Sequence, residues 1–192
     1  MNQRYFICGD KLLALNAKVG TSSFARAIIK KYYPDIEKMI TEAAYPEGKN
    51  ADNQQFQMFI PYRTNPDRPV ICMLRDPVER FRSAMAQVRL TDVDATIQEL
   101  INETGDYGRR GRNKLVENVH FVPQSRVTGD PISYYRFPED IDLVAEILGL
   151  DLPLPIINEA TAAKPTLTTE QEHQVKDFYA KDLILWNSLQ EI

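Results

Sequence analysis

The sequence predicts an α/β fold, with one domain over residues 1–192 and a central, mainly parallel sheet flanked by helices. Short apolar runs of strand length alternate with helical patterns, which is typical of this class. The run Pro69–Leu74 is apolar throughout, as expected of a strand buried on both faces in a parallel sheet. A chain of 192 residues is long enough to bury a sizeable core.

The N-terminal third predicts two short strands and two helices. The strands cover Arg4–Cys8 and Leu12–Asn16 and are joined at Gly9-Asp10. A glycine-containing loop follows the second strand and leads into a helix whose apolar face carries Phe24, Ala27, Ile28 and Tyr32. A second helix is expected over Ile36–Ala44, and residues 45–69 have no assignment.

A helix should begin directly after the strand at Pro69–Leu74. Asp76 is the expected N-cap, Pro77 the first helical residue and Glu79 the reciprocal capping partner, with the helix running to about Val88. Four further elements are predicted downstream. They are a helix over Asp94–Glu103, a strand over Ile132–Phe137, a helix that is opened by Pro138-Glu-Asp, carries Ile141 and Leu148 on its apolar face and is ended by Gly149, and a long amphipathic helix over Thr168–Leu189.

Composition excludes several classes of protein. Hydrophobic residues make up 43% and charged residues 26% of the chain, so it is neither disordered nor collagen-like. The net charge of −4 argues against a nucleic-acid or membrane-surface partner. Cys8 and Cys72 lie in apolar runs, so we expect two buried thiols and no zinc site. Without a signal peptide or a transmembrane run, a cytoplasmic protein is expected.

The loop from Lys18 to Ser23 has the composition of an anion-binding turn. It lies between a strand and a helix N-terminus, where backbone N–H groups and the helix dipole favour negative charge. Lys18 adds a positive charge, Gly20 lets the backbone approach a ligand, and the following three residues carry hydroxyl groups. The order of lysine and glycine differs from a Walker A loop. An ordinary strand–helix turn would look similar, so both interpretations stay open.

A second candidate anion site lies at the end of the strand at Pro69–Leu74. Arg75 follows the strand, at the edge where open α/β sheets bind ligands. Ser83 lies about two turns into the next helix, so an arginine fork and a hydroxyl could hold a separate phosphate. The alternative is a structural Arg75–Asp76 pair at the start of a helix. Two such sites in one small domain suggest one ligand with phosphates at both ends.

These two segments resemble the motifs of sulfotransferases that use 3′-phosphoadenosine 5′-phosphosulfate (PAPS). Ala17–Phe24 resembles the 5′-phosphosulfate loop, and Leu74–Ser83 resembles the 3′-phosphate motif R-D-P-x-x-R-x-x-S. The spacing of the motifs is similar to that of the carbohydrate (Golgi-type) enzymes. Val119–Gln124 and Asp177–Trp186 are similar to two further segments of that group. The resemblance spans nearly the whole chain.

The resemblance implies a P-loop-like three-layer fold and sulfuryl transfer from PAPS to a hydroxyl or amine of a carbohydrate or small-molecule acceptor, without a metal. Lys18 would stabilise the bridging oxygen of the leaving group, and Arg75 and Ser83 would hold the 3′-phosphate. The remaining cofactor-binding residues implied are those of the loop: Val19, Gly20, Thr21, Ser22 and Ser23.

The catalytic base is not identified by the resemblance. His120 is either the base or a structural histidine, and the carboxylates Glu37, Glu42 and Glu47 are the other candidates. The basic stretch 109–114 is either a solvated loop or an anion clamp, and Lys164 lies in a loop that approaches the nucleotide in relatives. The alternatives for function are a non-catalytic 3′-phosphoadenosine-binding module and an ATP-dependent kinase. The acceptor and the oligomeric state are left open.

Overall fold

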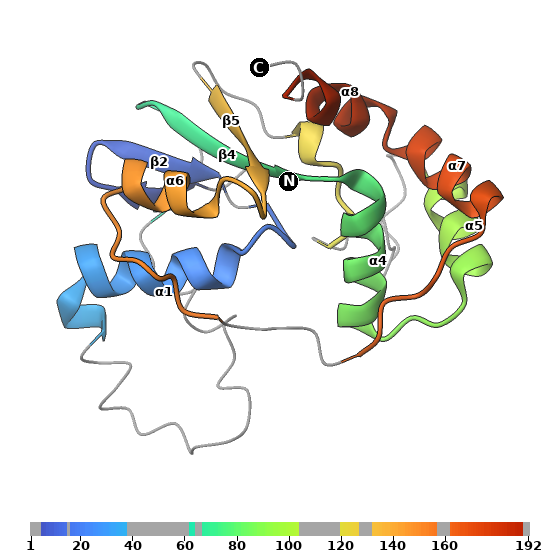
Figure 1. Ribbon diagram of the computed structural model, residues 1–192, viewed down its shortest axis with the longest axis horizontal. Helices are drawn as coiled ribbons and strands as arrows, with labels where there is room; N and C mark the ends of the chain where they lie inside the picture. Colours follow the sequence, from blue (N-terminus) through green and yellow to red (C-terminus); the bar gives the residue numbers. More distant parts are fainter. Residues whose placement is uncertain are drawn as a thin grey trace. The chain divides into compact units, whose positions relative to one another are not determined.

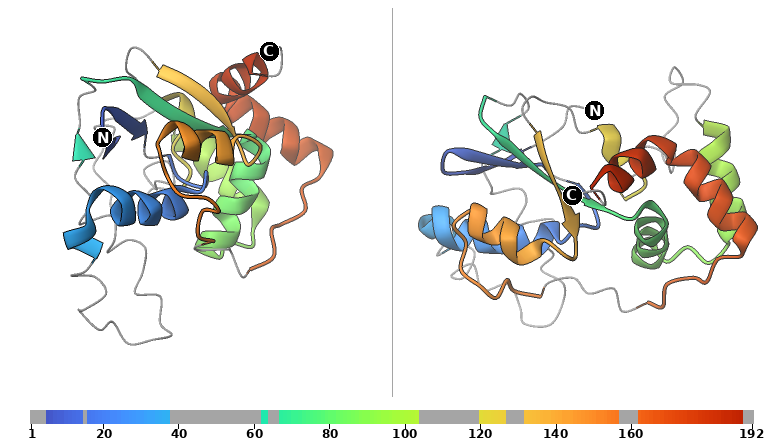
Figure 2. Two further views of the ribbon diagram at one scale, coloured as in Figure 1. Left: turned by 60° about the vertical axis from the view of Figure 1, so that its left-hand side comes forward. Right: turned by 45° about the horizontal axis from the view of Figure 1, so that its top comes forward.

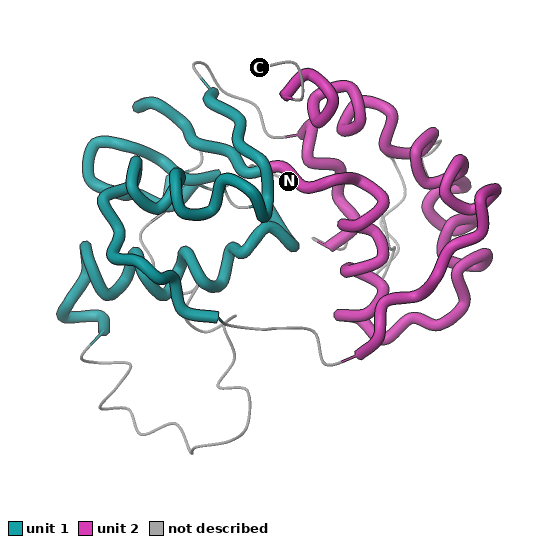
Figure 3. Tube along the Cα trace, in the orientation of Figure 1, with its two compact units in different colours: residues 1–73, 127–159 teal, residues 74–126, 160–192 magenta. Residues whose placement is uncertain are grey.

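The computed structural model describes residues 5–14, 16–37, 62–63, 67–103, 120–126, 132–156 and 162–189. These residues form a sheet with helices (Figure 1), which confirms the predicted α/β class. The chain divides into two compact units (Figure 3), residues 1–73 with 127–159 and residues 74–126 with 160–192. Whether the whole chain acts as one domain stays a prediction, and each unit is described by itself.

The first unit contains a five-stranded sheet with the order β3-β1-β2-β4-β5. Its strands are β1 (Tyr5–Cys8), β2 (Lys11–Ala14), β3 (Tyr62–Arg63), β4 (Val70–Arg75) and β5 (Ile132–Phe137). β2 and β4 are parallel, with Leu12 opposite Val70. β1 pairs antiparallel with β2, because the two-residue turn at Gly9-Asp10 returns the chain directly, and β3 pairs antiparallel with the other edge of β1. The last two residues of β4 belong to the second unit.

Two helices of the first unit, α1 (Thr21–Tyr32) and α6 (Ile141–Ile147), lie on one face of the sheet (Figure 2). Their apolar faces form a core with the strand residues that point the same way; its members include Phe6, Leu13, Phe24, Ile28, Ile71, Met73, Val144 and Leu148. β4 is buried on both faces from Val70 to Leu74, as the apolar run predicts. Gly149, with φ of 65°, follows the end of α6 as expected.

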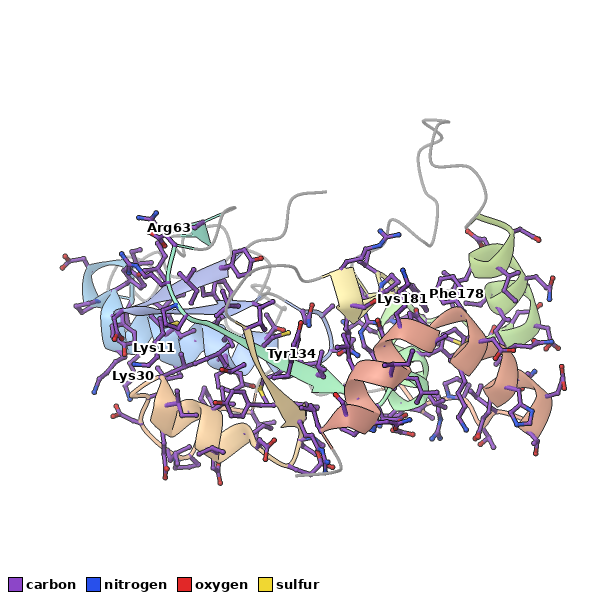
Figure 4. The ribbon with its side chains drawn as sticks, turned by 90° about the horizontal axis from the view of Figure 1, so that it is seen from above. Lys11, Lys30, Arg63, Tyr134, Phe178 and Lys181 are labelled. Carbon is purple, nitrogen blue, oxygen red and sulfur yellow. The ribbon has the colours of Figure 1, made fainter. Side chains whose placement is uncertain are left out.

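Side chains on the other face of the sheet are also buried. Tyr134 lies on β5 (Figure 4), and burial, together with the nearby Cys72 and Tyr5, raises the pKa of its phenol. Because side chains alternate along a strand, Tyr134 points away from Tyr135, which packs against the α1 and α6 core. Both cysteines are free and buried, as predicted.

The second unit is helical. It contains α4 (Pro77–Val88), α5 (Val93–Glu103), the short 3₁₀ helix η2 (Gln124–Arg126), α7 (Thr169–Phe178) and α8 (Ala180–Ser188). α4, α5 and α7 share an apolar core that also takes in Phe121; the ring centroids of Phe81 and Phe121 are 5.9 Å apart, in an edge-to-face arrangement. α5 confirms the helix predicted over Asp94–Glu103, and β5 confirms the strand predicted over Ile132–Phe137.

The start of α4 confirms half of the predicted capping box. Asp76 Oδ1 accepts a hydrogen bond from the backbone N–H of Glu79 at 2.8 Å, and Pro77 is the first helical residue. The reciprocal role expected of the Glu79 side chain is wrong. Its carboxylate instead pairs with Arg82 and Lys164, whose charges offer stronger hydrogen bonds than a backbone N–H.

One long helix over Thr168–Leu189 was expected, and this is wrong. The segment forms α7 and α8, separated at Tyr179, whose ψ of 28° departs from helical geometry. Tyr179 is buried, and its hydroxyl donates to the carbonyl oxygen of Phe121 at 2.7 Å. This tertiary contact lies at the break. The predicted start of the segment is confirmed to within one residue. Thr168 is the N-cap of α7 and forms a reciprocal capping box with Gln171.

Candidate functional site

The loop between β2 and α1 is fixed at its start by Asn16. This side chain is buried, and its Nδ2 donates to the carbonyl oxygen of Met73 on β4 at 3.2 Å. The Thr21 hydroxyl donates to the Asn16 carbonyl oxygen, which closes the loop onto itself. The loop is therefore tied to the parallel neighbour of β2, two residues before that strand ends at Arg75.

The loop backbone has an unusual conformation at two positions. Lys18 has φ of 68° and Gly20 has φ of 74°, both in the left-handed region. Gly20 is also the residue before α1, and a Cβ atom added to it would lie 2.9 Å from Cε2 of Phe137. A glycine is required here both for the dihedral angle and for the close approach of β5. Lys18 carries the strain of a left-handed non-glycine residue.

The N-terminus of α1 has the arrangement that binds anions elsewhere. Phe24 N–H is the first to bond inside the helix, to the Gly20 carbonyl oxygen at 3.1 Å. The N–H groups of the preceding residues point out of the helix end, where the dipole is positive. The N-cap residue, Gly20, has no side chain with which to cap this end. The loop can therefore present backbone donors and the partly exposed Lys18 to a phosphate or sulfate group.

The expected cofactor-binding residues of this loop differ in what they offer. Val19 is buried, so its side chain is not available to a ligand. The hydroxyl hydrogen of Thr21 is directed at the Asn16 carbonyl oxygen, so this side chain stabilises the loop. Ser22 and Ser23 are partly exposed in the first turn of α1.

Arg75 lies at the end of β4, and its backbone is held by the side chain of Gln124. Gln124 Oε1 accepts from Arg75 N–H, and Gln124 Nε2 donates to the Arg75 carbonyl oxygen, both at 2.9 Å. The Arg75 side chain is 15% exposed, and its Nη2 lies 3.9 Å from Glu79 Oε2. Ser83 is only 4% exposed, so it is the less accessible of the two expected phosphate ligands.

Arg80, which precedes Ser83 on α4, has a structural role. It is fully buried, its Nη2 donates to the carbonyl oxygen of Val122, and its guanidinium carbon lies 5.7 Å from the centroid of the Tyr179 ring. Burial raises the pKa of the Tyr179 hydroxyl far above its usual value, against an opposing effect of the Arg80 charge. Tyr179 is therefore a neutral hydrogen-bond donor.

Residues of the two further segments that carry the resemblance contact each other in the second unit. The buried carboxylate of Asp182 accepts from the backbone N–H groups of Gln124 at 2.7 Å and Ser125 at 2.8 Å. Tyr179 donates to Phe121 in the same segment. Gln124 and Asp182 were not singled out as individual residues by sequence reasoning, although both stand in the segments that carry the resemblance. The Gln124 side chain holds the backbone of Arg75, and the Asp182 carboxylate holds the backbone of Gln124.

No catalytic base is identified by the geometry. His120 lies partly buried in the turn before Phe121. The Glu37 carboxylate pairs with Arg26 at 2.7 Å. Glu42, Glu47 and the basic stretch 109–114 lie outside the described residues. Lys164 pairs with Glu79 at 3.0 Å.

In the part of the chain that the structure describes, no group of three or more histidine, cysteine, aspartate or glutamate side chains is placed to hold a metal ion. None of the helices in the described ranges has both the length and the apolar character needed to cross a bilayer.

Comparison of the chain with protein-family models, curated proteins and solved structures finds no match in any of the three. The resemblance to PAPS-dependent sulfotransferases therefore stays a prediction.

Proposed function

We propose that this protein is a PAPS-dependent sulfotransferase with a P-loop-like three-layer fold, acting on a hydroxyl or amine of a carbohydrate or small molecule. The observation that carries the proposal is the hydrogen bond from Asn16 to Met73. It ties the start of the Lys18–Ser23 loop to β4, the strand that ends at Arg75. Both sequence motifs thus follow neighbouring parallel strands, β2 and β4.

The Lys18–Ser23 loop would bind the 5′ end of the nucleotide. The first turn of α1 offers backbone N–H groups and a positive dipole, which suit a phosphate oxyanion. Lys18 lies in this loop with a left-handed backbone conformation. Its ammonium would stabilise negative charge on the bridging oxygen as the sulfur–oxygen bond breaks, which is an electrostatic contribution to the transition state.

Arg75 would bind the 3′-phosphate, the group that distinguishes PAPS from ATP. Its backbone is fixed on both sides by Gln124, so the guanidinium starts from a defined position. An arginine fork matches a phosphate with two parallel hydrogen bonds. Ser83 would contribute its hydroxyl from the buried face of α4.

Catalysis would rest on positioning and on charge. Bound PAPS would supply the sulfuryl group. His120 is the proposed base; it would take the proton of the acceptor hydroxyl or amine as the new bond to sulfur forms. Glu37 suits this role less, since its carboxylate is engaged by Arg26.

The test is calorimetric titration with 3′-phosphoadenosine 5′-phosphate (PAP), compared with ATP, ADP and adenosine 5′-phosphosulfate. Selective micromolar binding of PAP supports the proposal. Preference for ATP with Mg²⁺ favours the kinase alternative, and no binding of any nucleotide contradicts the proposal. PAP binding without sulfuryl transfer from PAPS across an acceptor panel favours a non-catalytic binding module.

A further inference from the structure

Three cations of the second unit surround the carboxylate of Glu79. Lys164 Nζ lies 3.0 Å from Glu79 Oε2, Arg82 Nη1 pairs with Glu79 Oε1, and Arg75 Nη2 lies 3.9 Å from Glu79 Oε2. Partial burial raises the pKa of Glu79, but Lys164 and Arg82 outweigh this and leave it lowered. Glu79 is therefore ionised at neutral pH.

The three cations come from separate parts of the chain. Arg75 ends β4, Arg82 lies on α4, and Lys164 belongs to the segment before α7. Arg82 also donates from Nε to the carbonyl oxygen of Pro165 at 2.8 Å, which holds the Lys164 segment beside α4. A cluster assembled from three segments depends on the tertiary fold, whereas the usual ion pair joins neighbours on one helix.

The charges of this cluster do not balance. Arg75, Arg82 and Lys164 contribute three positive charges and Glu79 contributes one negative charge, which leaves two positive charges in excess. A phosphate dianion in place of the Glu79 carboxylate would reduce this excess to one. The chemistry of the cluster therefore suits a phosphate monoester.

Glu79 is able to leave the cluster. Its side chain is 38% exposed, as is that of Lys164, and that of Arg82 is 30% exposed. Ion pairs this accessible to water contribute little to stability. A carboxylate offers two oxygens, whereas a phosphate monoester offers three oxygens and a second charge to the same donors.

We propose that the Glu79 carboxylate competes with a phosphate monoester for Arg75, Arg82 and Lys164, and so sets the affinity of this site. Ligand binding turns Glu79 out toward solvent, and Arg82 joins Arg75 as a phosphate ligand. The identity of the monoester as the 3′-phosphate of a nucleotide rests on the proposed function. The competition itself rests only on the cluster.

The experiment is titration of the wild type and of Glu79→Gln with three ligands: PAP, adenosine 5′-phosphate and inorganic phosphate. Glutamine keeps the size of the side chain and removes its charge. We expect PAP and inorganic phosphate to bind Glu79→Gln about fivefold more tightly than the wild type. Adenosine 5′-phosphate should be unchanged, because the proposed function assigns its one phosphate to the Lys18–Ser23 loop. Glu146→Gln, on the exposed side of α6, removes the same charge elsewhere and should change nothing.

A second variant keeps the test decisive if Glu79→Gln is poorly folded. Lys164→Gln should weaken PAP binding about fivefold and leave adenosine 5′-phosphate unchanged.

Unchanged or weaker PAP binding by folded Glu79→Gln, beside normal binding by the wild type, overturns the competition and leaves the proposed function standing. Tighter inorganic phosphate binding without any nucleotide binding supports the competition and contradicts the proposed function. If no ligand binds either protein, both are wrong.

Discussion

The side-chain amide of Gln124 forms two hydrogen bonds with the backbone of Arg75, one in each direction and each 2.9 Å long. The backbone N–H of Gln124 is in turn held by Asp182 at 2.7 Å. A buried glutamine thus connects α8 to the end of β4. The position of the Arg75 guanidinium depends on residues 49 and 107 positions later in the chain.

Gln124→Ala should lower the free energy of unfolding by about 2–4 kcal/mol, because it leaves the N–H and the carbonyl group of Arg75 without their partner. Urea unfolding measures this loss. Gln98→Ala, an exposed glutamine on α5, should cost less than about 0.5 kcal/mol. Equal losses for the two variants would show that the Arg75 contacts contribute nothing specific.

Two glycines with similar φ angles separate backbone strain from steric contact. Gly9 has φ of 61° and room for a Cβ atom, whose nearest neighbour would be 3.6 Å away, whereas Gly20 has φ of 74° and a contact of 2.9 Å to Phe137. We expect Gly9→Ala to cost about 1 kcal/mol and Gly20→Ala about 2–3 kcal/mol. Thermal unfolding of both variants measures the difference. Similar losses would mean that Phe137 moves aside freely.

Arg75→Ala should weaken the binding of PAP by about 2–4 kcal/mol, the scale for loss of a charge-assisted partner, and barely change the binding of adenosine 5′-phosphate. Calorimetry with both ligands distinguishes the 3′-phosphate from the rest of the nucleotide. Lys181→Ala removes an exposed positive charge from α8 (Figure 4) and serves as the control. If Arg75→Ala weakens both ligands equally, Arg75 is a structural residue.

Lys18→Ala should reduce the turnover of sulfuryl transfer at least 100-fold while changing PAP affinity much less, because the lysine acts on charge that develops as the bond breaks. Steady-state kinetics with PAPS, once an acceptor is known, gives kcat and KM separately. Lys30→Ala, at an exposed position on α1 (Figure 4), is the matched control. A change in KM alone would make Lys18 a phosphate anchor without a role in the chemical step.

Stability should fall as the pH rises above 9, because burial raises the pKa of the Cys8 thiol from 9.0 to about 12. The unfolded chain releases this proton first, so the stabilisation is complete below pH 9 and is lost progressively toward pH 12. We expect Cys8 to account for a loss of about 1.4 kcal/mol between pH 8 and pH 10. Urea unfolding of the wild type and Cys8→Ala over this range isolates the thiol. Parallel curves for the two proteins would contradict the assignment.

Sequence reasoning succeeded where the signal is local. Asp76 and Pro77 begin α4, and Gly149 follows α6, because each residue acts on the backbone next to it. The apolar run from Val70 to Leu74 forms a strand buried on both faces. This too is a local signal, because a strand buried on both faces needs consecutive apolar residues.

The remaining features depend on residues far apart in the sequence. The break at Tyr179 interrupts an otherwise regular helical pattern. It coincides with a hydrogen bond from Tyr179 to Phe121, which lies 58 positions earlier in the chain. Asn16 reaches Met73 across 57 positions, and Glu79 pairs with Lys164 across 85. A periodic pattern carries no information about such partners, so the loop anchor and the cationic cluster required the structure.

The division of the chain has a consequence for synthesis on the ribosome. The polypeptide crosses between the two units at residues 73–74, 126–127 and 159–160, so neither unit is a continuous segment. β4 emerges early, but its neighbour β5 follows about 60 residues later. The nascent chain must therefore hold an apolar strand with one unpaired edge while most of the helical unit is translated. Growing chains of this protein are expected to depend on chaperones until β5 has left the exit tunnel.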